Sequence, residues 1–387
     1  MRYFDSKSIF SIRFTGLLLV MGFIFTAGTV NARLTANCDT TVVGPGTEVD
    51  IQAAVDASSP GDTICLDGAF ALANPVEIRD DKVGLTVTSL DRDNHALLTA
   101  TGFGLRLIGT NGVTISYLDI VAGSEGVRLQ SSDLLGFVGQ TSDFSLIGND
   151  ITAPFGIQAA GQSIESTETD SDYLIADNTI HAISIGLILT HNSNAVVRNN
   201  YIEVTTPFHN FGGGLITTIS DGRLTVTDNV FVGPGGPIIG AIQYGIHIDH
   251  FIFPNQFETV QNNLDIKRNT ISGFHTGIEV LMSDNPFPRG VTDLDLLKND
   301  ITCNPFSGTN LFGAPPAAVA LLNLGATPVL DDVQLINNKL TDCDVGLFEI
   351  GNVTNVRALG PPMNREAMGF DHPPANINAQ GSGVQGP

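Results

Sequence analysis

Two short segments of the 387-residue sequence place histidine and carboxylate side chains at matching distances from a glycine. Residues 245–249 read Gly-Ile-His-Ile-Asp, and residues 277–279 read Gly-Ile-Glu. If these segments are neighbouring strands, His247, Asp249 and Glu279 lie on one face, and the two strands that carry them are about 4.8 Å apart. A histidine beside two carboxylates can perform acid–base catalysis or hold a metal ion. A cross-strand polar pair without any chemistry is the alternative interpretation.

Long connecting segments flank both of these expected strands, at residues 250–263 and 283–290. We expect them to wall an open groove with the three side chains on its floor and a further histidine at its edge. The sequence does not identify a metal for this site. The candidate catalytic residues are His247, Asp249, Glu279 and His275.

The elements that must position these residues belong to a repeat. From residue 140 onward, an asparagine is followed two residues later by Ile, Leu or Phe. Successive repeat asparagines are 22 to 40 residues apart. A repeat of 20–50 residues indicates stacked structural units rather than one globular core. The repeated asparagines are Asn149, Asn178, Asn200, Asn229, Asn269, Asn299 and Asn338.

Each repeat contains short segments in which apolar and polar residues alternate, such as Leu224–Val226 and Leu264–Ile266. This alternation predicts strands, and no segment between them is long and periodic enough to be a crossover helix. The pattern therefore predicts an all-β fold, a single-stranded parallel β-helix (a solenoid), with about eight to ten coils.

The asparagines have a structural explanation within such a solenoid. Asparagine tolerates left-handed backbone geometry, so we expect each one to take that conformation at a turn. Stacked asparagine side chains also hydrogen-bond from coil to coil. By contrast, Asp331 and Asp332 form an isolated pair beside a strand start, and we expect a solvated turn there.

The N-terminal part predicts a lid for the solenoid. Residues 48–57 have helical apolar spacing, Pro60 and Gly61 end that pattern, and a strand follows. With its Ile-Gln-x-Ala-Val and Pro-Gly-Asp-Thr-Ile elements, this region resembles the opening of the pectin-lyase-like right-handed parallel β-helix superfamily. The resemblance covers about residues 40–355 and implies a right-handed solenoid with an N-terminal capping helix.

The ends of the chain differ from the repeat. Residues 1–32 combine basic, apolar and small-residue regions in the order of a secretory signal peptide. We therefore expect a secreted or periplasmic protein with a β-helix domain at 33–360. Residues 361–387 are rich in Pro and Gly and predict a flexible tail.

Export is consistent with an even number of cysteines, four in all. Cys303 and Cys343 follow repeat asparagines by four and five residues, so they occupy nearly equivalent places on neighbouring coils. We expect them to form one disulfide, and Cys38 and Cys65 to form a second that joins the cap to the first coil.

Composition limits the partners. The formal charge is -22, with 18 Lys and Arg against 40 Asp and Glu. Such a chain is repelled by nucleic acid and by anionic membrane surfaces. No segment after the signal peptide is apolar enough to span a bilayer, so we expect no nucleic-acid partner and no membrane insertion of the mature chain.

The resemblance implies activity on a polysaccharide, as a lyase or a glycoside hydrolase, and lyases of this fold often use calcium held by acidic residues. However, the paired-aspartate set of the polygalacturonases and the Asp-Pro-His signature of the alginate epimerases are absent. Two other interpretations therefore stay open. One is a non-catalytic envelope, surface or adhesive β-helix protein, and the other is a periplasmic accessory protein for a metal site.

Overall fold

The computed structural model describes most of the solenoid. The expected signal peptide and most of the expected tail lie outside the described residues, so neither prediction is tested. The described residues are 35–130, 141–160, 172–190, 194–205, 211–218, 223–235, 242–249, 260–261, 263–282, 290–304, 316–323, 329–343, 345–351, 353–359 and 367–370.

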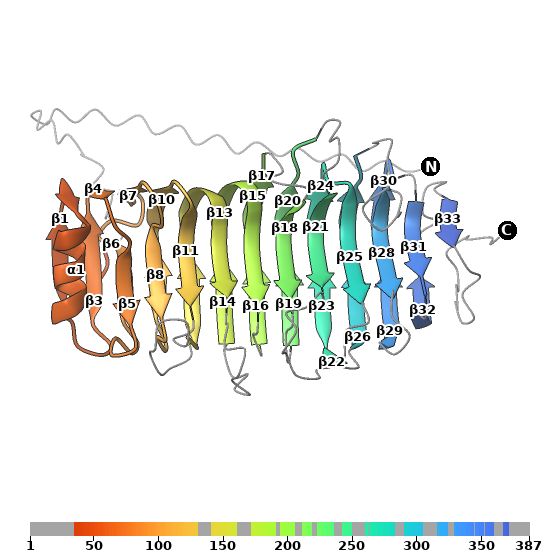
Figure 1. Ribbon diagram of the computed structural model, residues 1–387, viewed down its shortest axis with the longest axis horizontal. Coiled ribbons are helices and arrows are strands. Elements are labelled where there is room, and N and C mark those ends of the chain that lie inside the picture. Colours follow the sequence, from red (N-terminus) through yellow and green to blue (C-terminus); the bar gives the residue numbers. More distant parts are fainter. Residues whose placement is uncertain are drawn as a thin grey trace, which may run out of the picture. The chain divides into compact units, whose positions relative to one another are not determined.

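The strands form a right-handed parallel β-helix, in which each turn of the chain adds one rung (Figure 1). The strand ladders are parallel throughout the described residues, which confirms the expected fold class. One sheet has 13 strands, and we call it the first face. A second sheet of 20 strands bends into two further faces because β13 and β15 each run around the corner between them.

The first face contains β1 (Thr40–Val43), β3 (Thr63–Asp67), β6 (Thr86–Ser89), β9 (Thr114–Ser116), β12 (Phe144–Ile147), β14 (Asp172–Ala176), β16 (Asn194–Arg198), β19 (Arg223–Thr227), β22 (Val260–Gln261), β23 (Leu264–Lys267), β26 (Gly290–Leu297), β29 (Val329–Ile336) and β32 (Val353–Leu359). The second face contains β2 (Gly46–Thr47), β4 (Ala69–Leu72), β7 (Ala96–Ala100), β10 (Leu118–Ala122), the first halves of β13 (Asp150–Ala160) and β15 (Thr179–Thr190), β17 (Tyr201–Val204), β20 (Val230–Val232), β24 (Thr270–Ser272), β27 (Asp300–Thr302) and β30 (Lys339–Thr341). The third face contains β5 (Val76–Arg79), β8 (Leu105–Ile108), β11 (Glu125–Gln130), the second halves of β13 and β15, β18 (Phe211–Thr218), β21 (Ile242–Asp249), β25 (Thr276–Met282), β28 (Ala317–Asn323), β31 (Val345–Ile350) and β33 (Ala367–Phe370).

Alternate residues of every face point into one continuous apolar core. On the first face, Val226, Ile266 and Leu296 are partners on successive strands, and each is fully buried. Burial of such a column removes apolar surface from water at every rung, at about 25 cal/mol per Å². The alternation of apolar and polar residues in the sequence therefore shows which side chains of each strand face the core.

The repeat asparagines form a buried ladder at the corner between the first and second faces. The Nδ2 of Asn200 donates to Oδ1 of Asn229 at 2.9 Å, and the Asn200 backbone N–H donates to the same oxygen. The same Nδ2 also donates to the carbonyl of Ile175 in the preceding coil. All seven asparagines repeat the side-chain stacking and are at most 5% exposed, which confirms the expected stack.

The left-handed backbone conformation, however, belongs to the residue before each asparagine, so that part of the prediction is wrong. The preceding residues Asp177, Arg268 and Lys298 have φ of 59°, 56° and 57°. The asparagine side chain has to point into the corner to bond along the solenoid axis, so its neighbour makes the sharp change of direction. For Arg268 and Lys298 this conformation costs roughly 1–2 kcal/mol each, and the ladder offsets that cost.

A column of glycines runs along the third face, and close packing between coils explains it. Its members are Gly126, Gly156, Gly186, Gly214, Gly245 and Gly277. A Cβ on Gly245 would lie 2.6 Å from the carbonyl oxygen of Gly277 and 2.3 Å from the side chain of Ile271. No side chain fits at that corner, so the chain approaches its neighbouring coil closely there.

The first face has twelve successive rungs in the described residues, more than the eight to ten coils expected. The extra coils lie before Asn149, where other residues replace the repeat asparagine. Leu118, for example, takes the equivalent place after β9, and its backbone N–H donates to Oδ1 of Asn149. The asparagine repeat therefore marks only part of the solenoid.

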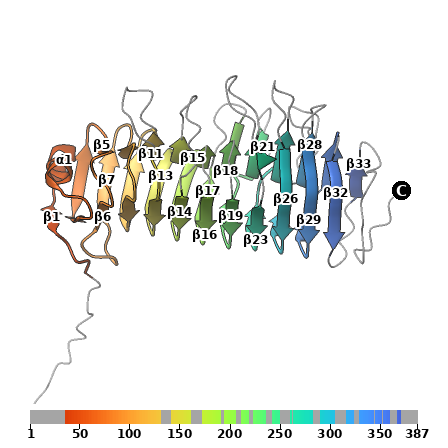
Figure 2. The same cartoon turned by 90° about the horizontal axis from the view of Figure 1, so that it is seen from below.

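The N-terminal cap and both disulfides agree with the sequence predictions. Helix α1 (Glu48–Ala57) buries Ile51 and Val55 against the end of the core, and both views place it beside the first rungs (Figures 1 and 2). Disulfides join Cys38 to Cys65 and Cys303 to Cys343, with Cα–Cα distances of 5.7 and 4.7 Å.

Two further observations concern the expected tail and membrane insertion. Strand β33 lies within the segment expected as a flexible tail and pairs with β31. In the described residues, no helix combines the length and the apolar character that crossing a bilayer requires.

We expect Asn229→Ala to lower the free energy of unfolding by about 3 kcal/mol or more. The substitution leaves the backbone N–H and Nδ2 of Asn200 and the carbonyl of Val197 without their buried partner. Urea denaturation measures the change. Asn194→Ala, at an exposed asparagine, is the matched control and should change stability by less than about 1 kcal/mol. Equal losses for both variants would contradict a special contribution of the ladder to stability.

Glu349 predicts a pH dependence of stability. It occupies a core-facing position next to Leu321 and is 5% exposed, and burial raises its pKa to about 7. Because the unfolded carboxyl ionises first, stability should fall between about pH 4.5 and pH 7 and then level off, by roughly 3 kcal/mol. Denaturation of the wild type and Glu349→Gln at pH 5 and pH 8 checks this. The two proteins should differ in the size of the fall, and parallel curves would contradict the assignment.

Candidate functional site

The column of residues two positions after each glycine is in register along the third face, as the sequence predicts. The parallel pairing of the strands places each member opposite the next, and the second column, which contains Asp249, is aligned in the same way. His247 and Glu279 are therefore direct neighbours. The first column is Arg128, Gln158, Ile188, Ile216, His247, Glu279, Ala320 and Phe348.

His247 and Glu279 form a close pair. Nδ1 of His247 lies 3.3 Å from Oε1 of Glu279, and both side chains are fully buried. The ring of Tyr244 stacks on the imidazole, with centroids 4.4 Å apart and planes 19° apart. The sequence predicted the pairing, but it did not predict the stacked tyrosine, which is one more polar group in the same cluster.

The expectation of an open groove above this pair differs from the structure, because both side chains have no exposed surface. The position of a residue within the repeat determines only that its side chain points away from the core. It does not determine whether other parts of the chain cover it. A buried His–Glu pair of this kind contributes to packing and to hydrogen bonding whether or not it takes part in catalysis.

The two other candidate residues are near the pair in the fold. Asp249 ends β21 in register with Leu281. His275 precedes β25, is 7% exposed, and has Nδ1 3.1 Å from Oγ1 of Thr276. The register thus brings all four candidates to two neighbouring coils, while the catalytic roles expected for them stay predictions.

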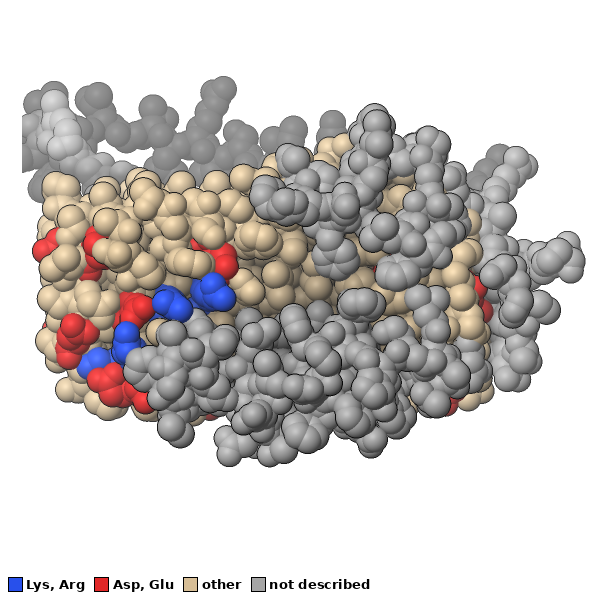
Figure 3. Space-filling model, viewed as in Figure 1, with Lys and Arg blue, Asp and Glu red and all other residues tan. Residues whose placement is uncertain are grey.

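The third face changes character along the solenoid. Near α1 it carries paired charges: Glu77 pairs with Arg106, and Arg128 pairs with the buried Glu125. Figure 3 shows basic and acidic side chains gathered at that end. Beyond Glu279 the outward residues are apolar and buried and include Leu281 and Leu322. The His247–Glu279 pair borders that apolar cluster.

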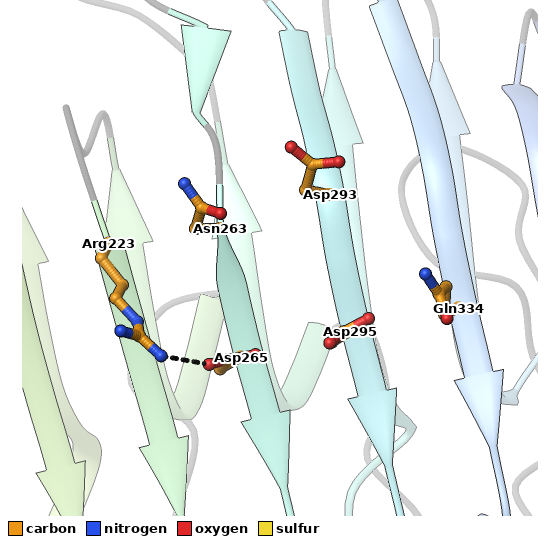
Figure 4. A pocket seen from close by; sticks show the side chains of 6 residues that line it. All are labelled: Arg223, Asn263, Asp265, Asp293, Asp295 and Gln334. Carbon is orange, nitrogen blue, oxygen red and sulfur yellow. Dashed lines mark hydrogen bonds and ion pairs between the residues drawn. The ribbon is translucent and has the colours of Figure 1, made fainter.

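An open polar groove lies on the first face, and we call it the first-face groove. It has a volume of about 650 Å³. Figure 4 shows that its side chains come from four successive strands, β19, β23, β26 and β29, or from directly beside them. Its lining residues are Arg223, Asn263, Asp265, Asp293, Asp295 and Gln334.

One carboxylate of this groove is held in the ionised form. Burial works to raise the pKa of Asp265, but hydrogen bonds from Lys267 and Arg223 outweigh burial and keep that pKa below its usual range. Lys267 Nζ lies 2.6 Å from Asp265, and Arg223 lies 2.9 Å from it. Asp295 is the register partner of Asp265 on the next strand and lies 3.7 Å from Lys267.

A second carboxyl beside the groove has the opposite tendency. Burial and the nearby charge of Asp293, which shares a hydrogen bond with Asp332, raise the pKa of Asp332. Asp331 has a lowered pKa, because Thr354 donates a hydrogen bond to it, burial opposes this effect, and Asn355 donates a second. The Asp331–Asp332 pair is therefore not isolated, because Asp332 shares a hydrogen bond with Asp293. Both residues are partly exposed and Asp332 has a φ of 51°, in agreement with the expected turn.

Sequence reasoning missed this groove although a signal exists. On three successive first-face strands, an Asx residue precedes the strand core by one position, and a polar residue follows two positions later. This spacing occurs at Asn263 with Asp265, at Asp293 with Asp295, and at Asp332 with Gln334. Asn263, Asp293 and Asp332 also share positive φ, between 51° and 59°.

No cluster of three or more His, Cys, Asp or Glu side chains arranged to hold a metal ion occurs among the described residues. This finding concerns only the part of the chain that the structure describes, and it identifies no site for calcium there.

Comparisons with known proteins give distant similarities only. No protein family model matches the chain, and no curated protein sequence matches it significantly. An alginate lyase from Paenibacillus sp. str. FPU-7 aligns with a TM-score of 0.42 and 13% identity, over 88% of this chain and 99% of the lyase. The Dettilon tailspike protein gives 0.41 and 13%, over 84% and 64%. PfbA, a surface adhesin of Streptococcus pneumoniae, gives 0.31 and 10%, over 81% and 89%. Similarities of this size support no inference about activity.

We expect His247→Ala to lower the free energy of unfolding by roughly 2 kcal/mol or more. The variant removes a ring stacked on Tyr244 and leaves the carboxyl of Glu279 buried without this neighbour. Thermal denaturation measures the loss, with His181→Ala at a partly exposed histidine as the control. An unchanged melting temperature for His247→Ala would contradict the tight packing of this pair.

Proposed function

We propose that this protein is exported and acts on a polysaccharide, and that the first-face groove is where it does so. One observation carries the proposal. The groove contains a carboxylate held ionised, Asp265, and beside the groove Asp332, which shares a hydrogen bond with the lining residue Asp293, has a raised pKa. Two carboxyl groups whose environments move their pKa values apart are the usual arrangement for a general acid and its ionised partner.

The chemistry that fits this arrangement is hydrolysis of a glycosidic bond. Asp332 would donate its proton to the leaving oxygen, and Asp293, its hydrogen-bond partner, would help to retain that proton. The ionised Asp265 and its neighbour Asp295 would stabilise the positive charge that develops on the sugar ring or would activate water. Arg223, Asn263 and Gln334 provide hydrogen bonds for sugar hydroxyl groups.

The electrostatics of the groove favour a neutral polysaccharide over a uronate. The chain has a formal charge of -22, and the groove holds more carboxylates than cations. A polyuronate would be repelled unless cations bridged the charges. Hydrolysis is therefore favoured over the elimination that lyases perform on uronates.

Export rests on two features. The two disulfides persist in an oxidising compartment. The expected signal peptide at residues 1–32 has the sequence of a secretory leader. We accordingly propose a secreted or periplasmic location.

We also retain His247, Asp249, Glu279 and His275 as a second candidate acid–base site. In this role Glu279 or Asp249 would be the acid or base, and His247 would orient it or share its proton. Such a site needs a route for substrate to the His247–Glu279 pair. Their complete burial favours the alternative, a non-catalytic surface or adhesive β-helix in which the pair is structural.

Asparagine substitutions in the groove test the proposal. We expect Asp332→Asn to lower kcat by about 10²- to 10⁴-fold, because the variant cannot donate the proton. We expect Asp265→Asn to do the same by removing the ionised carboxylate. The release of reducing ends from neutral polysaccharides measures both, and ultraviolet absorbance of unsaturated products from a polyuronate would instead indicate a lyase.

Asp300→Asn is the matched control, because Asp300 is exposed on the second face and pairs with Lys339. It should retain full activity. If the wild type is active and both groove variants keep that activity, the groove is not the site, and loss of activity in His247→Ala with retained folding would move it to the third face.

A further inference from the structure

The second face carries polar side chains that are fixed in place by pairing. Nδ1 of His95 lies 2.8 Å from Oδ1 of Asp119, and Nδ1 of His181 lies 2.9 Å from Oε2 of Glu203. All four side chains are partly exposed, between 23% and 44%. Pairing through Nδ1 orients each imidazole and leaves its other nitrogen directed elsewhere.

Asp150 links the two pairs. Asp150 is the register partner of Asp119 on the neighbouring strand. On its other side Asp150 pairs with Thr179, and His181 lies two residues after Thr179 on that strand. Burial and then the charge of Asp119 raise the pKa of Asp150, and both histidines act in the opposite direction. The two pairs and Asp150 therefore form one electrostatically connected row across neighbouring coils.

An exposed aromatic ring extends this row. Tyr201 is 37% exposed, and its ring centroid lies 6.0 Å from that of His181. At the other end, Tyr117 lies 6.0 Å from His95, and the guanidinium of Arg92 lies over the Tyr117 ring. Of the two tyrosines, Tyr201 therefore offers the more accessible ring for stacking.

The exposed apolar residues on this face are isolated rather than contiguous. Leu97, Val121 and Val230 are each 36–42% exposed. Each of them has a polar register partner on a neighbouring strand, and these partners are Asp119, Thr152 and Tyr201 respectively. A protein interface has a fully buried apolar centre, which isolated single residues do not supply.

We propose that this row is a binding strip for a neutral saccharide chain, separate from the first-face groove. The second-face strip consists of His95, Asp119, Asp150, His181, Tyr201 and Glu203. The proposal rests on the proposed function, since it assigns a second contact surface for the same class of polymer.

Three features of the strip fit a saccharide. The exposed ring of Tyr201 can stack on the apolar face of a sugar while its hydroxyl stays in water. The paired imidazoles and carboxylates present oriented donors and acceptors to hydroxyl groups at little entropic cost. The three carboxylates of the strip disfavour an anionic polymer.

Affinity electrophoresis of the full mature protein in gels containing xylan, β-glucan or galactomannan tests the strip, with alginate as the anionic comparison. We expect at least one neutral polymer to retard the wild type. Tyr201→Ala and His181→Ala should each weaken that binding by about three- to tenfold, while Tyr201→Phe retains it. Val230→Ala, one coil further in the Tyr201 column, should bind as the wild type does.

The groove variants separate this proposal from the proposed function. Both proposals hold if Asp332→Asn abolishes hydrolysis but is still retarded in the gel, and if Tyr201→Ala is retarded less than the wild type. If Tyr201→Ala and His181→Ala bind as tightly as the wild type, the strip is wrong, whatever the groove does. Stronger retardation by alginate than by any neutral polymer would also overturn it. Absence of both binding and hydrolysis for every neutral polymer would overturn the strip and the proposed function together.

Discussion

The amide-to-amide hydrogen bond between successive coils is the interaction on which this solenoid depends. Each asparagine of the ladder except the last donates to the side chain of the next asparagine, and its own side chain bonds to the backbone of the preceding coil. Because these groups are buried, a coil that slipped by one residue would leave several of them unsatisfied. The ladder therefore sets the register of each coil relative to the next. Every column on every face inherits that register.

Functional surfaces in this architecture are assembled down columns rather than along the chain. Asp265 and Asp295 are neighbours because each occupies the same position of its coil, although 30 residues separate them. His247 and Glu279 are neighbours for the same reason. The two pairs nevertheless have opposite environments. The carboxylates lie in an open groove beside cations, and the His–Glu pair is enclosed beside an apolar cluster.

These differences explain what the sequence could and could not predict. The repeat period and the alternation determine which way a side chain points, so the His247 and Glu279 column and the two disulfides were predictable. Burial of that pair was not, because it depends on which other parts of the chain cover the face. The groove was missed because positive φ at Asn263, Asp293 and Asp332 interrupts the alternation that marks strands.

The two disulfides have a consequence for how long the folded protein persists. Each one joins neighbouring coils near an end of the described stack, Cys38–Cys65 beside α1 and Cys303–Cys343 near β31. A terminal coil has a neighbour on one side only, so in a solenoid it opens more readily than an inner coil. A covalent link between neighbours makes the opening of one coil require the opening of two. In a reducing environment the ends would fray and be trimmed by proteases while the inner rungs, held by the asparagine ladder, survived. The lifetime of the molecule would then follow the redox state of its surroundings.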